Sequence, residues 1–578
     1  MTNLRSGNWL NAKDVHGFIR RGGLKAQGFS EKGFKNKPVI GICNSWSELT
    51  HCNGHLRQIA ESVKRGVLQA GGLPLEFPVI SLGEPYMLPT AMLFRNLMAM
   101  DVEESIRANP LDGVVLLSGC DKTTPAMLMG AASADIPSIF VSGGPALKGN
   151  WRGEVLGSCT DCRKYYVELR AGTINRQQYD DMEQNIYRSY GHCMVMGTAS
   201  SMGCIVESLG MTLPGGAAIP AVDSRRYAFA EETGMRAVEL VKENLRPSQI
   251  MTQKSFLNAI RVLMALGGST NAVIHLLALA GRLDVDIDLK TFDDISSTVP
   301  VLANLKPVGK YLMEDFFYAG GLPALLNEMS DLLDLDMLTV SGKTLRENII
   351  GCSNYNKDVI HSKDTALFNE GGLVVLQGNL APNGAIIKHT AADPALLKHR
   401  GKAVVFDSLE EMEAKIDDPD LDVDKDSVII LRNIGPKGGP GMPEWGFIPI
   451  PQKLLKKGIR DMVRITDGRM SGTAFGTIVL HVSPEARVGG PLSIVKNGDY
   501  IVLDVKSRQL NLDLDTKDIA LRFTDYNKTQ TAKPEYRGYS WLYSNHVLQA
   551  EHGCDFDFLR RDYLNSDQLS DDPTVPTV

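Results

Sequence analysis

The sequence predicts an α/β fold in which an N-terminal α/β/α domain with a parallel sheet is followed by a C-terminal β-barrel-like domain. From about residue 37 short apolar runs alternate with longer helical patterns, which is typical of parallel α/β layers. After about residue 370 short strand-like runs separated by turn residues replace that alternation. At 578 residues the chain is also too long for one core, since single cores stop growing at roughly 250–300 residues.

Short apolar runs in the N-terminal part predict buried strands, each followed by polar or glycine-rich sequence. They are residues 37–46, 76–83, 112–120 and 137–144. Helical patterns at 52–72 and 90–109 lie between them. Because ligands collect outside the carboxyl ends of parallel strands, functional residues are expected directly after these runs.

The middle of the chain is rich in predicted helices. They cover residues 225–245, 255–283 and 321–335. The segment GGSTNA interrupts the second of them, so Gly267, Gly268 and Ser269 are expected to end one helix and cap the next. The segment SGKT at 341–344 is not a phosphate-binding loop, because position 337, where the motif needs glycine, is Met.

The predicted boundaries are 1–370 for the α/β domain, 371–565 for the mostly β domain and 566–578 for a disordered tail. The strand-like runs of the second domain are 371–380, 402–408, 426–433, 461–468, 476–483 and 492–514. Within the last run, Asn497-Gly498 is a hairpin signal. The tail NSDQLSDDPTVPTV is polar and acidic, a composition that cannot build a core.

Composition excludes several classes of protein. Hydrophobic residues make up 43% and charged residues 22%, as in ordinary soluble globular proteins. A net charge of −7 and no basic stripe argue against a nucleic-acid partner. The N-terminus has no apolar signal region and no run reaches the ~18 apolar residues of a membrane helix, so a cytoplasmic protein without a membrane partner is expected.

Three cysteines stand in glycine- and polar-rich runs: Cys52 in SELTHCNGH, Cys120 in LLSGCDKTTPA and Cys193 in YGHCMVMGTASSMG. If the fold brings them together, three soft ligands would bind one metal centre and leave a position open for substrate, as catalytic sites do. The alternative is that each is a small buried residue. Asp121 and Lys122 beside Cys120 favour a metal centre, because an apolar core would not choose them.

The nine cysteines of the chain are an odd number, scattered along its length, and are interpreted as reduced thiols or ligands instead of disulfides. Cys159 and Cys162 form a CxxC pair without a second pair, and are interpreted as incidental.

Other candidate residues follow predicted strands or lie in loops. Glu84 follows the run 76–83, at the same rim as Cys52 and Cys120. Glu444 lies in the irregular loop IGPKGGPGMPEWG, and Arg469 and Ser471 lie in RITDGRMSGTAFG after a strand-like run. A serine beside glycine is usually a turn former, so Ser471 alone decides nothing.

Taken together, these motifs resemble the dehydratase family that contains dihydroxy-acid, phosphogluconate and aldonic (sugar-acid) dehydratases. The resemblance runs from KPVIGICNSWSELTHCN through SLGEPYMLPTAMLFRN, SGCDKTTPA, GTASSMG, GGSTNA, QGNLAPNGAIIK, GPKGGPGMPE and TDGRMSG to GGPL. SGCDKTTPA and DGRMSGTAFGT are more similar to the sugar-acid branch than to the branched-chain amino-acid branch.

The resemblance implies two inorganic cofactors and a small hydroxy-acid substrate. An iron–sulfur cluster, [2Fe-2S] with [4Fe-4S] as the alternative, would be held by Cys52, Cys120 and Cys193. Mg²⁺ would be bound by Glu84, Asp121, Glu444 and a carbamylated Lys122, since carbamylation turns a repelling amine into an oxygen ligand. A homodimer or homotetramer is implied as well.

The implied reaction is the dehydration of a 2,3-dihydroxy acid to a 2-keto-3-deoxy acid. Mg²⁺ on the carboxylate and C2 hydroxyl would act as Lewis acid and template, and the open iron would activate the C3 hydroxyl. Ser471 would be the base, ionised with help from nearby metal charge or Arg469, since a hydroxyl needs such help. Lys122, Arg469 and Ser471 are therefore the catalytic candidates.

Residues beside these positions are expected to bear on the substrate. They are His51, His192, Met194 and Thr473. Each histidine either hydrogen-bonds a cluster sulfur or competes as a ligand, or is a packed core residue. Met194 and Val195 make the surroundings of Cys193 more apolar, which leaves a short or less hydroxylated substrate open.

Three alternatives stay open. The nearest is a dihydroxy-acid dehydratase of branched-chain amino-acid biosynthesis. A non-catalytic iron–sulfur redox sensor is another, but Glu84, Asp121, Lys122, Glu444 and Ser471 together argue against it. The third is an electron-transfer protein with a fourth thiolate from Cys43, Cys159, Cys162 or Cys204, which the predicted placement of Cys43 inside a strand disfavours.

Overall fold

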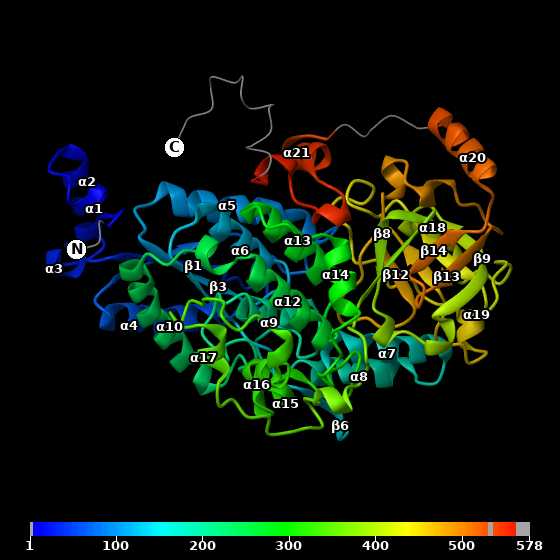
Figure 1. Cartoon of the computed structure of the whole chain (residues 1–578), viewed down its shortest axis with the longest axis horizontal. Coiled ribbons are helices and arrows are strands. Elements are labelled where there is room, and N and C mark those ends of the chain that lie inside the picture. The colour runs from blue at the N-terminus through cyan, green and yellow to red at the C-terminus, as the bar shows by residue number, and fades with distance from the viewer. Residues whose placement is uncertain (1–3, 530–535, 562–578) are drawn as a thin grey trace.

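The computed structural model of the protein describes residues 4–529 and 536–561. The described chain forms an α/β part and a β-barrel that lie along the longest axis of the molecule (Figure 1). The predicted disordered tail at 566–578 lies outside the described residues.

A four-stranded parallel sheet is the centre of the α/β part. Its order is β2 (Leu73–Pro78), β1 (Val39–Asn44), β3 (Gly113–Ser118) and β4 (Ser138–Ser142). Every residue of β1, β3 and β4 is buried, as expected for continuous apolar runs covered on both faces. Helices α4 (Leu56–Gln69) and α10 (Ser224–Glu243) lie on one side of this sheet, and α5 (Arg95–Ala108) and α6 (Thr123–Ala134) on the other (Figure 1).

The α/β prediction is confirmed, with one shift in a strand. Predicted strands at 37–46, 112–120 and 137–144 coincide with β1, β3 and β4. The run predicted at 76–83 begins earlier, because β2 covers Leu73–Pro78 and residues 79–83 form the loop after it. Glu84 therefore stands farther beyond its strand than the sequence indicates.

A layer of helices lies behind this sheet and carries the interrupted helix that the sequence predicts. Its members include α9 (Thr198–Ser208), α12 (Gln253–Ala265) and α13 (Asn271–Leu283). The segment GGSTNA separates α12 from α13 as expected, and the Ser269 Oγ accepts a hydrogen bond from the Asn271 N–H at 3.2 Å. In SGKT, Thr344 caps the short helix α17 (Leu345–Ile349) and accepts from the Glu347 N–H.

The remaining helices and a small hairpin surround these layers. They are α1 (Gly7–Leu10), α2 (Val15–Ala26), α3 (Glu31–Phe34), α7 (Ser158–Ala171), α8 (Arg176–Ile186), α11 (Pro247–Ile250), α14 (Leu289–Ser296), α15 (Met313–Tyr318), α16 (Gly321–Glu328), α18 (Leu409–Lys415), α19 (Gln452–Leu455), α20 (Thr516–Thr529), α21 (Gly538–His546), β5 (Gly149–Trp151) and β6 (Glu154–Leu156). Helix α7 precedes the barrel in sequence but packs against it, because Arg170 donates to the Ile450 carbonyl and Thr160 to the Thr473 carbonyl.

The C-terminal part contains a closed barrel of eight strands, which confirms the predicted barrel-like domain. Around the barrel the order is β10 (Val428–Leu431), β11 (Arg464–Thr466), β12 (Ile478–Ser483), β8 (Ala381–Ile387), β7 (Val374–Gly378), β14 (Gln509–Leu512), β13 (Tyr500–Asp504) and β9 (Lys398–Phe406). Strands β9 to β12 are parallel neighbours. Aliphatic side chains of Val374, Ile430, Val479 and Ile501 belong to its core.

Two local expectations for the barrel differ from the structure. Strand β8 was not predicted, because its sequence APNGAII contains Pro, Asn and Gly, which are rare inside strands. The hairpin signal at Asn497-Gly498 is wrong, since β13 begins after it and joins β14 through residues 505–508. Gly498 instead adopts a φ of 88° in the turn that enters β13.

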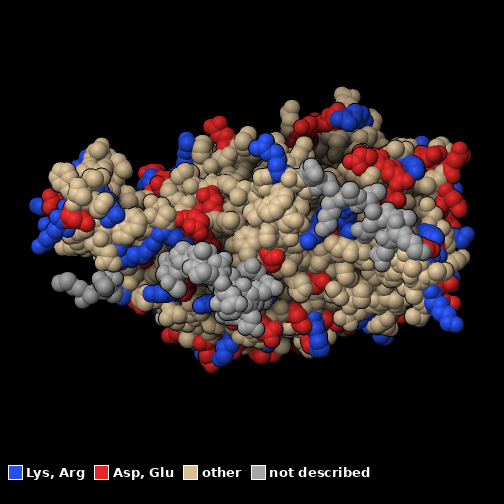
Figure 2. Space-filling view, turned by 90° about the horizontal axis from the view of Figure 1, so that it is seen from above, with Lys and Arg blue, Asp and Glu red and all other residues tan. Residues whose placement is uncertain are grey.

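Lys, Arg, Asp and Glu side chains are interspersed on the face that Figure 2 shows. Among the described residues, no helix combines the length and the apolar character needed to cross a membrane.

After the barrel, the chain returns to the α/β part, where α21 lies above α13 (Figure 1). Arg282 of α13 and Asp555 form an ion pair with an Nε–Oδ2 distance of 2.6 Å, and both side chains are fully buried. Arg95 donates to the carbonyls of Gly553 and Cys554. These contacts attach the C-terminal segment to the helices that cover the sheet.

We expect Asp555→Asn to destabilise the protein, because it leaves the buried Arg282 guanidinium with only the more distant Glu103 carboxylate, 3.6 Å away, as countercharge. Removing one partner of a buried ion pair costs roughly 3–5 kcal/mol. Urea denaturation followed by circular dichroism should show a lower midpoint. Asp294→Asn removes an exposed carboxylate paired with Lys290 and should leave the midpoint unchanged; equal midpoints for both variants would contradict the prediction.

Candidate active site

Loops that follow three adjacent strands bring the N-terminal candidate residues to one edge of the sheet. Glu84 follows β2, Cys52 follows β1, and Cys120, Asp121 and Lys122 follow β3. The Asn53 side chain ties two of these loops together by accepting a hydrogen bond from the Gly119 N–H at 3.0 Å. A Cβ on Gly119 would lie 2.7 Å from the Cys52 carbonyl oxygen, so only glycine allows this approach.

Glu444 reaches the same edge from a barrel loop that two buried carboxylates hold in place. Asp467 accepts hydrogen bonds from the backbone N–H groups of residues 433 and 434. Glu485 accepts from those of residues 437 and 438. The glycine- and proline-rich loop, which has no helix or strand of its own, thus obtains its backbone partners from charged side chains.

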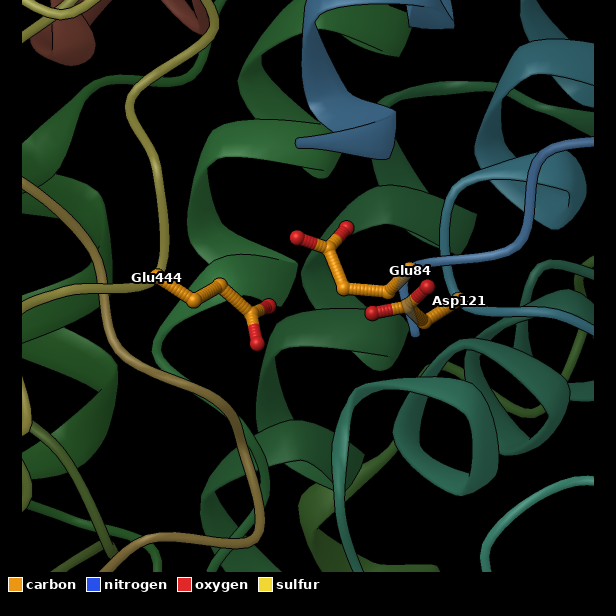
Figure 3. A group of neighbouring side chains, drawn as sticks. All are labelled: Glu84, Asp121 and Glu444. Atoms are coloured by element: carbon orange, nitrogen blue, oxygen red, sulfur yellow. The ribbon is translucent and has the colours of Figure 1, made fainter. Parts of the chain in front are cut away.

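The carboxylates of Glu84, Asp121 and Glu444 converge, with one oxygen of each within 4.8 Å of the others. Figure 3 shows Glu444 approaching from the opposite side to Glu84 and Asp121. The Lys122 Nζ is shared by all three, at 2.5 Å from Asp121, 3.0 Å from Glu444 and 3.3 Å from Glu84. Three acidic groups from two parts of the fold therefore surround one position.

Burial and charge shift the pKa values of these groups in opposite directions. Burial alone would lower the pKa of Lys122, but the carboxylates of Asp121, Glu444 and Glu84 outweigh it and raise that pKa above its usual value. Burial alone would raise the pKa of Glu444, yet the charges of Lys122 and Arg469 lower it to about 2. Burial raises the pKa of Glu84. Glu444 is therefore ionised beside a charged Lys122, and each group stabilises the charge of the other.

The Cys52 thiol is buried beside the thiol of Cys120, with Cys193 nearby. The neighbouring Cys120 thiol and burial raise the pKa of Cys52 well above its usual value. Cys120 also contacts the carboxylate group directly, since its Sγ lies 3.5 Å from the Asp121 Oδ1. Cys52 and Cys120 therefore lie next to the predicted metal carboxylates with Cys193 near them, and among the described residues the three sulfurs are not all within 4.8 Å of one another.

A fourth thiol lies beside Cys193, although the sequence interpretation treated it as incidental. The Tyr187 hydroxyl is 3.2 Å from the Cys159 Sγ and 3.9 Å from the Cys193 Sγ. The His51 ring packs edge-on against Tyr187, and its Nε2 is 3.6 Å from the Cys52 Sγ. Cys43 and Cys204 are buried in β1 and α9.

Ser471 lies in the loop between β11 and β12, which packs against the other motifs. The Asn271 side chain links this loop to the carboxylates, because its Nδ2 donates to the Met470 carbonyl and to the Glu444 Oε1. A Cβ on Gly472 would lie 2.5 Å from the Ser269 Oγ. Segment GGSTNA thus both separates two helices and positions the Ser471 loop.

Arg469, expected to assist Ser471, is directed to the carboxylates. Its guanidinium donates to the Glu444 Oε1, the Thr90 hydroxyl and the Met442 carbonyl. Thr473, in contrast, does contact Ser471, with 2.9 Å between the two hydroxyl oxygens.

The two other neighbours of Cys193 have the packed surroundings that were left open as an alternative. The His192 Nδ1 donates to the Cys193 carbonyl, and burial lowers its pKa to about 4. Met194 is fully buried against Val195 and Leu312, and its sulfur accepts a hydrogen bond from the Ser158 hydroxyl.

The residues present fit two inorganic groups. Oxygen ligands on three carboxylates suit a hard divalent cation, and in the described structure the buried Glu84 Oε2 accepts no hydrogen bond and is paired with the Lys122 Nζ at 3.3 Å. Crowded thiols with raised pKa values are relieved when a metal takes up their thiolates. The arrangement can therefore hold a carboxylate-bound cation beside a thiolate-bound centre.

Comparison with known proteins agrees with this geometry. Residues 37–348 match the family described as dihydroxy-acid/6-phosphogluconate dehydratase N-terminal, and residues 358–554 match its C-terminal counterpart. The chain belongs to this dehydratase family. It is similar to an L-arabinonate dehydratase of Rhizobium leguminosarum, with 52% identity over 96% of each chain.

Two further relatives show how the dehydratase is related to different branches. A 6-deoxy-6-sulfo-D-gluconate dehydratase of Pseudomonas putida is 46% identical over 96% of each chain. A dihydroxy-acid dehydratase of Caldanaerobacter subterraneus is 41% identical, over 94% of this chain and 98% of the relative. Identity to the two sugar-acid dehydratases is higher than identity to the dihydroxy-acid dehydratase, which agrees with the predicted likeness to the sugar-acid branch. The family and these relatives are dehydratases, so the protein is a hydro-lyase.

Several residues of this dehydratase site were not found from the sequence. Asn271 and Tyr187 belong to helices or loops without a metal-ligand pattern, and so does Arg163, whose Nη1 is 2.6 Å from the Thr473 Oγ1. Cys159 was noticed in its CxxC pair, but nothing in the sequence indicated that it would lie beside Cys193. The GGSTNA motif was the one available signal for Asn271, because a glycine pair inside a predicted helix indicates a special backbone position close to it.

We expect the three carboxylates to bind one divalent cation per chain. Glu84→Gln should weaken binding about tenfold or more, since it replaces a charged ligand by a neutral amide. Paramagnetic resonance of free Mn²⁺ during titration measures this. Glu76→Gln is the matched control, because Glu76 pairs with Lys64 outside the site; equal losses in both variants would be evidence against a cation at Glu84.

Binding should also depend on dissolved carbon dioxide. An unmodified Lys122 ammonium repels a cation, whereas a carbamate on Lys122 would add an oxygen ligand. Wild-type protein in bicarbonate-free buffer should therefore bind Mn²⁺ more weakly than in bicarbonate. Identical affinities in the two buffers would exclude a role for a carbamate in cation binding.

Proposed function

We propose that the protein dehydrates a 2,3-dihydroxy sugar acid of the aldonate class to a 2-keto-3-deoxy acid. The observation that carries this proposal is the contact between Cys120 and Asp121, which joins the thiols and the carboxylates into one site. Removing water across C2 and C3 needs charge stabilisation at the carboxylate end and help for the leaving hydroxyl. Two adjacent cation-binding groups are suited to those two tasks.

The proposed cofactors are Mg²⁺ and an iron–sulfur cluster, with [2Fe-2S] preferred to [4Fe-4S]. Glu84, Asp121, Glu444 and a carbamylated Lys122 would hold Mg²⁺. Cys52, Cys120 and Cys193 would hold the cluster. When bound, the two groups supply Lewis-acid chemistry at the substrate oxygens.

The side chains of the protein have separate tasks in this proposal. Ser471, in its ionised form, takes the proton from C2. The electron pair of the broken C2–H bond forms the C2–C3 double bond, and hydroxide leaves C3. The enol product then takes a proton at C3 and loses the proton of its C2 hydroxyl, and so becomes the keto acid. Arg469 and Asn271 hold Glu444 in place during these steps.

The relatives suggest which substrates to examine first. L-Arabinonate leads, because a relative with 52% identity is named for it. The buried positions of His192 and Met194 support the interpretation that they pack the Cys193 segment instead of selecting the substrate.

The test is turnover of a substrate panel by protein purified without oxygen. It contains L-arabinonate, other C4 to C6 aldonates, a sulfonated gluconate and 2,3-dihydroxyisovalerate, with keto-acid formation and loss of water followed by mass spectrometry. Keto-deoxy acid from at least one aldonate is expected. Turnover of 2,3-dihydroxyisovalerate alone would overturn the proposal in favour of a dihydroxy-acid dehydratase.

Ser471→Ala should lower kcat by about a hundredfold or more, which is the range for loss of a general base. The cation content should stay unchanged, because Ser471 is not among the carboxylates or thiols. Ser297→Ala, at the exposed end of α14, is the control and should keep full activity. A Ser471→Ala enzyme with the wild-type kcat would show that another group removes the proton.

A further inference from the structure

The Ser471 hydroxyl has a hydrogen-bonding environment that differs from an ordinary serine turn. Its Oγ is 2.9 Å from the Thr473 hydroxyl oxygen and accepts from the Thr473 backbone N–H at 3.4 Å. The backbone contact alone is a common turn in which a serine caps the residue two positions later. The hydroxyl contact adds a second possible donor to the same oxygen.

Arg163 of α7 decides which of the two hydroxyls donates. Its Nη1 lies 2.6 Å from the Thr473 Oγ1, and a guanidinium has only donors, so Thr473 accepts. Throughout residues 4–529 and 536–561, the Ser471 Oγ is the one acceptor in reach of the Thr473 hydroxyl proton. Thr473 therefore donates to Ser471, and the chain of donors runs from Arg163 through Thr473 to Ser471.

The positive charge of Arg163 is available for this task. In the described part of the chain no carboxylate forms an ion pair with Arg163, whose other contacts are the Cys159 carbonyl at 3.4 Å and the Phe447 ring at 5.7 Å. Arg170, about two turns farther along the same face of α7, instead pairs with Asp417. Both arginines line the same cavity of about 450 Å³, which extends to Glu444.

Packing fixes the positions of Arg163 and Thr473 relative to each other, although the two residues are 310 positions apart in the sequence. Thr473 is 3% exposed, and its carbonyl accepts a hydrogen bond from the Thr160 hydroxyl at 2.7 Å. Because Thr160 and Arg163 are on the same helix, α7 donates hydrogen bonds to both the carbonyl and the hydroxyl of Thr473.

We propose that Arg163 is a positioning residue that, through Thr473, prepares Ser471 to act as the base. A hydrogen bond to an ionised oxygen is strengthened when a charged donor polarises it. Two donors from Thr473 stabilise the Ser471 alkoxide, and its proton leaves to solvent before substrate binds. This assignment rests on the proposed dehydratase reaction with Ser471 as base, and it replaces Arg469 as the arginine that assists Ser471.

The test begins with Arg163→Gln and Arg163→Lys, measured on whichever substrate the wild-type enzyme turns over. Arg163→Gln should lower kcat about tenfold to a hundredfold and leave KM within about threefold, as for loss of a charge-assisted hydrogen bond. The isotope effect with C2-deuterated substrate should rise, because proton removal becomes slower. Arg163→Lys should recover part of kcat.

The matched control is Lys164→Gln, which removes an exposed positive charge from the same helix, paired with Glu154, without touching Thr473 or the barrel. It should keep wild-type kcat and isotope effect. Iron, sulfide and Mg²⁺ contents and thermal melting are measured for every variant, so that loss of cofactor or fold is separated from loss of positioning.

Thr473→Val provides a second arm that does not alter Arg163. It should slow the enzyme as much as Arg163→Gln, and the double variant should be no slower than either single variant, since both break the same chain of donors. Thr473→Ser, which keeps the hydroxyl, should retain activity.

Several results would overturn the proposal. They are an unchanged kcat in Arg163→Gln, a raised KM with normal kcat, which would make Arg163 a substrate-binding residue, and additive losses in the double variant. Failure of the proposed function itself is distinguishable, because wild-type enzyme would then form no keto-deoxy acid from any aldonate in the panel.

Discussion

The buried ammonium group of Lys122 is the constraint on which the rest of the site depends. Its side chain is fully buried, and a buried charge without partners is too costly to be tolerated. Asp121 and Glu84 provide partners from the edge of the parallel sheet, and Glu444 provides one from the barrel. The sheet edge and the barrel loop must therefore meet for the charge to be satisfied.

Other polar groups connect the loops that meet at Lys122 to one another. Asn271 spans Glu444 and the Ser471 loop, and Asp467 fixes the backbone that leads to Glu444. Asp121 contacts the thiol of Cys120, so the carboxylate group and the thiol group are directly adjacent. A chemical step that needs both groups at one substrate finds them prearranged here.

Much of the fold and of the site could be predicted because the signals were local. Strands end where polar residues begin, which placed Cys52, Glu84 and Cys120 at one rim before any contact was known. Strand β8 escaped this reasoning because Pro and Gly interrupt its pattern. Arg469 is two residues from Ser471 in sequence and was expected to assist it. In the structure its guanidinium instead donates to Glu444.

The sequence by itself determined the α/β and barrel classes, because periodicity and strand ends are properties of short segments. The resemblance of its motifs to the dehydratase family supplied the metal-ligand candidates, Glu444 among them. Only the tertiary structure decided that Cys159 lies beside Cys193 and that Arg163 reaches Thr473. Those contacts join residues far apart in the chain. They form because buried charges and hydrogen-bond donors need partners when the chain packs. A local sequence pattern does not indicate which distant residue will be the partner.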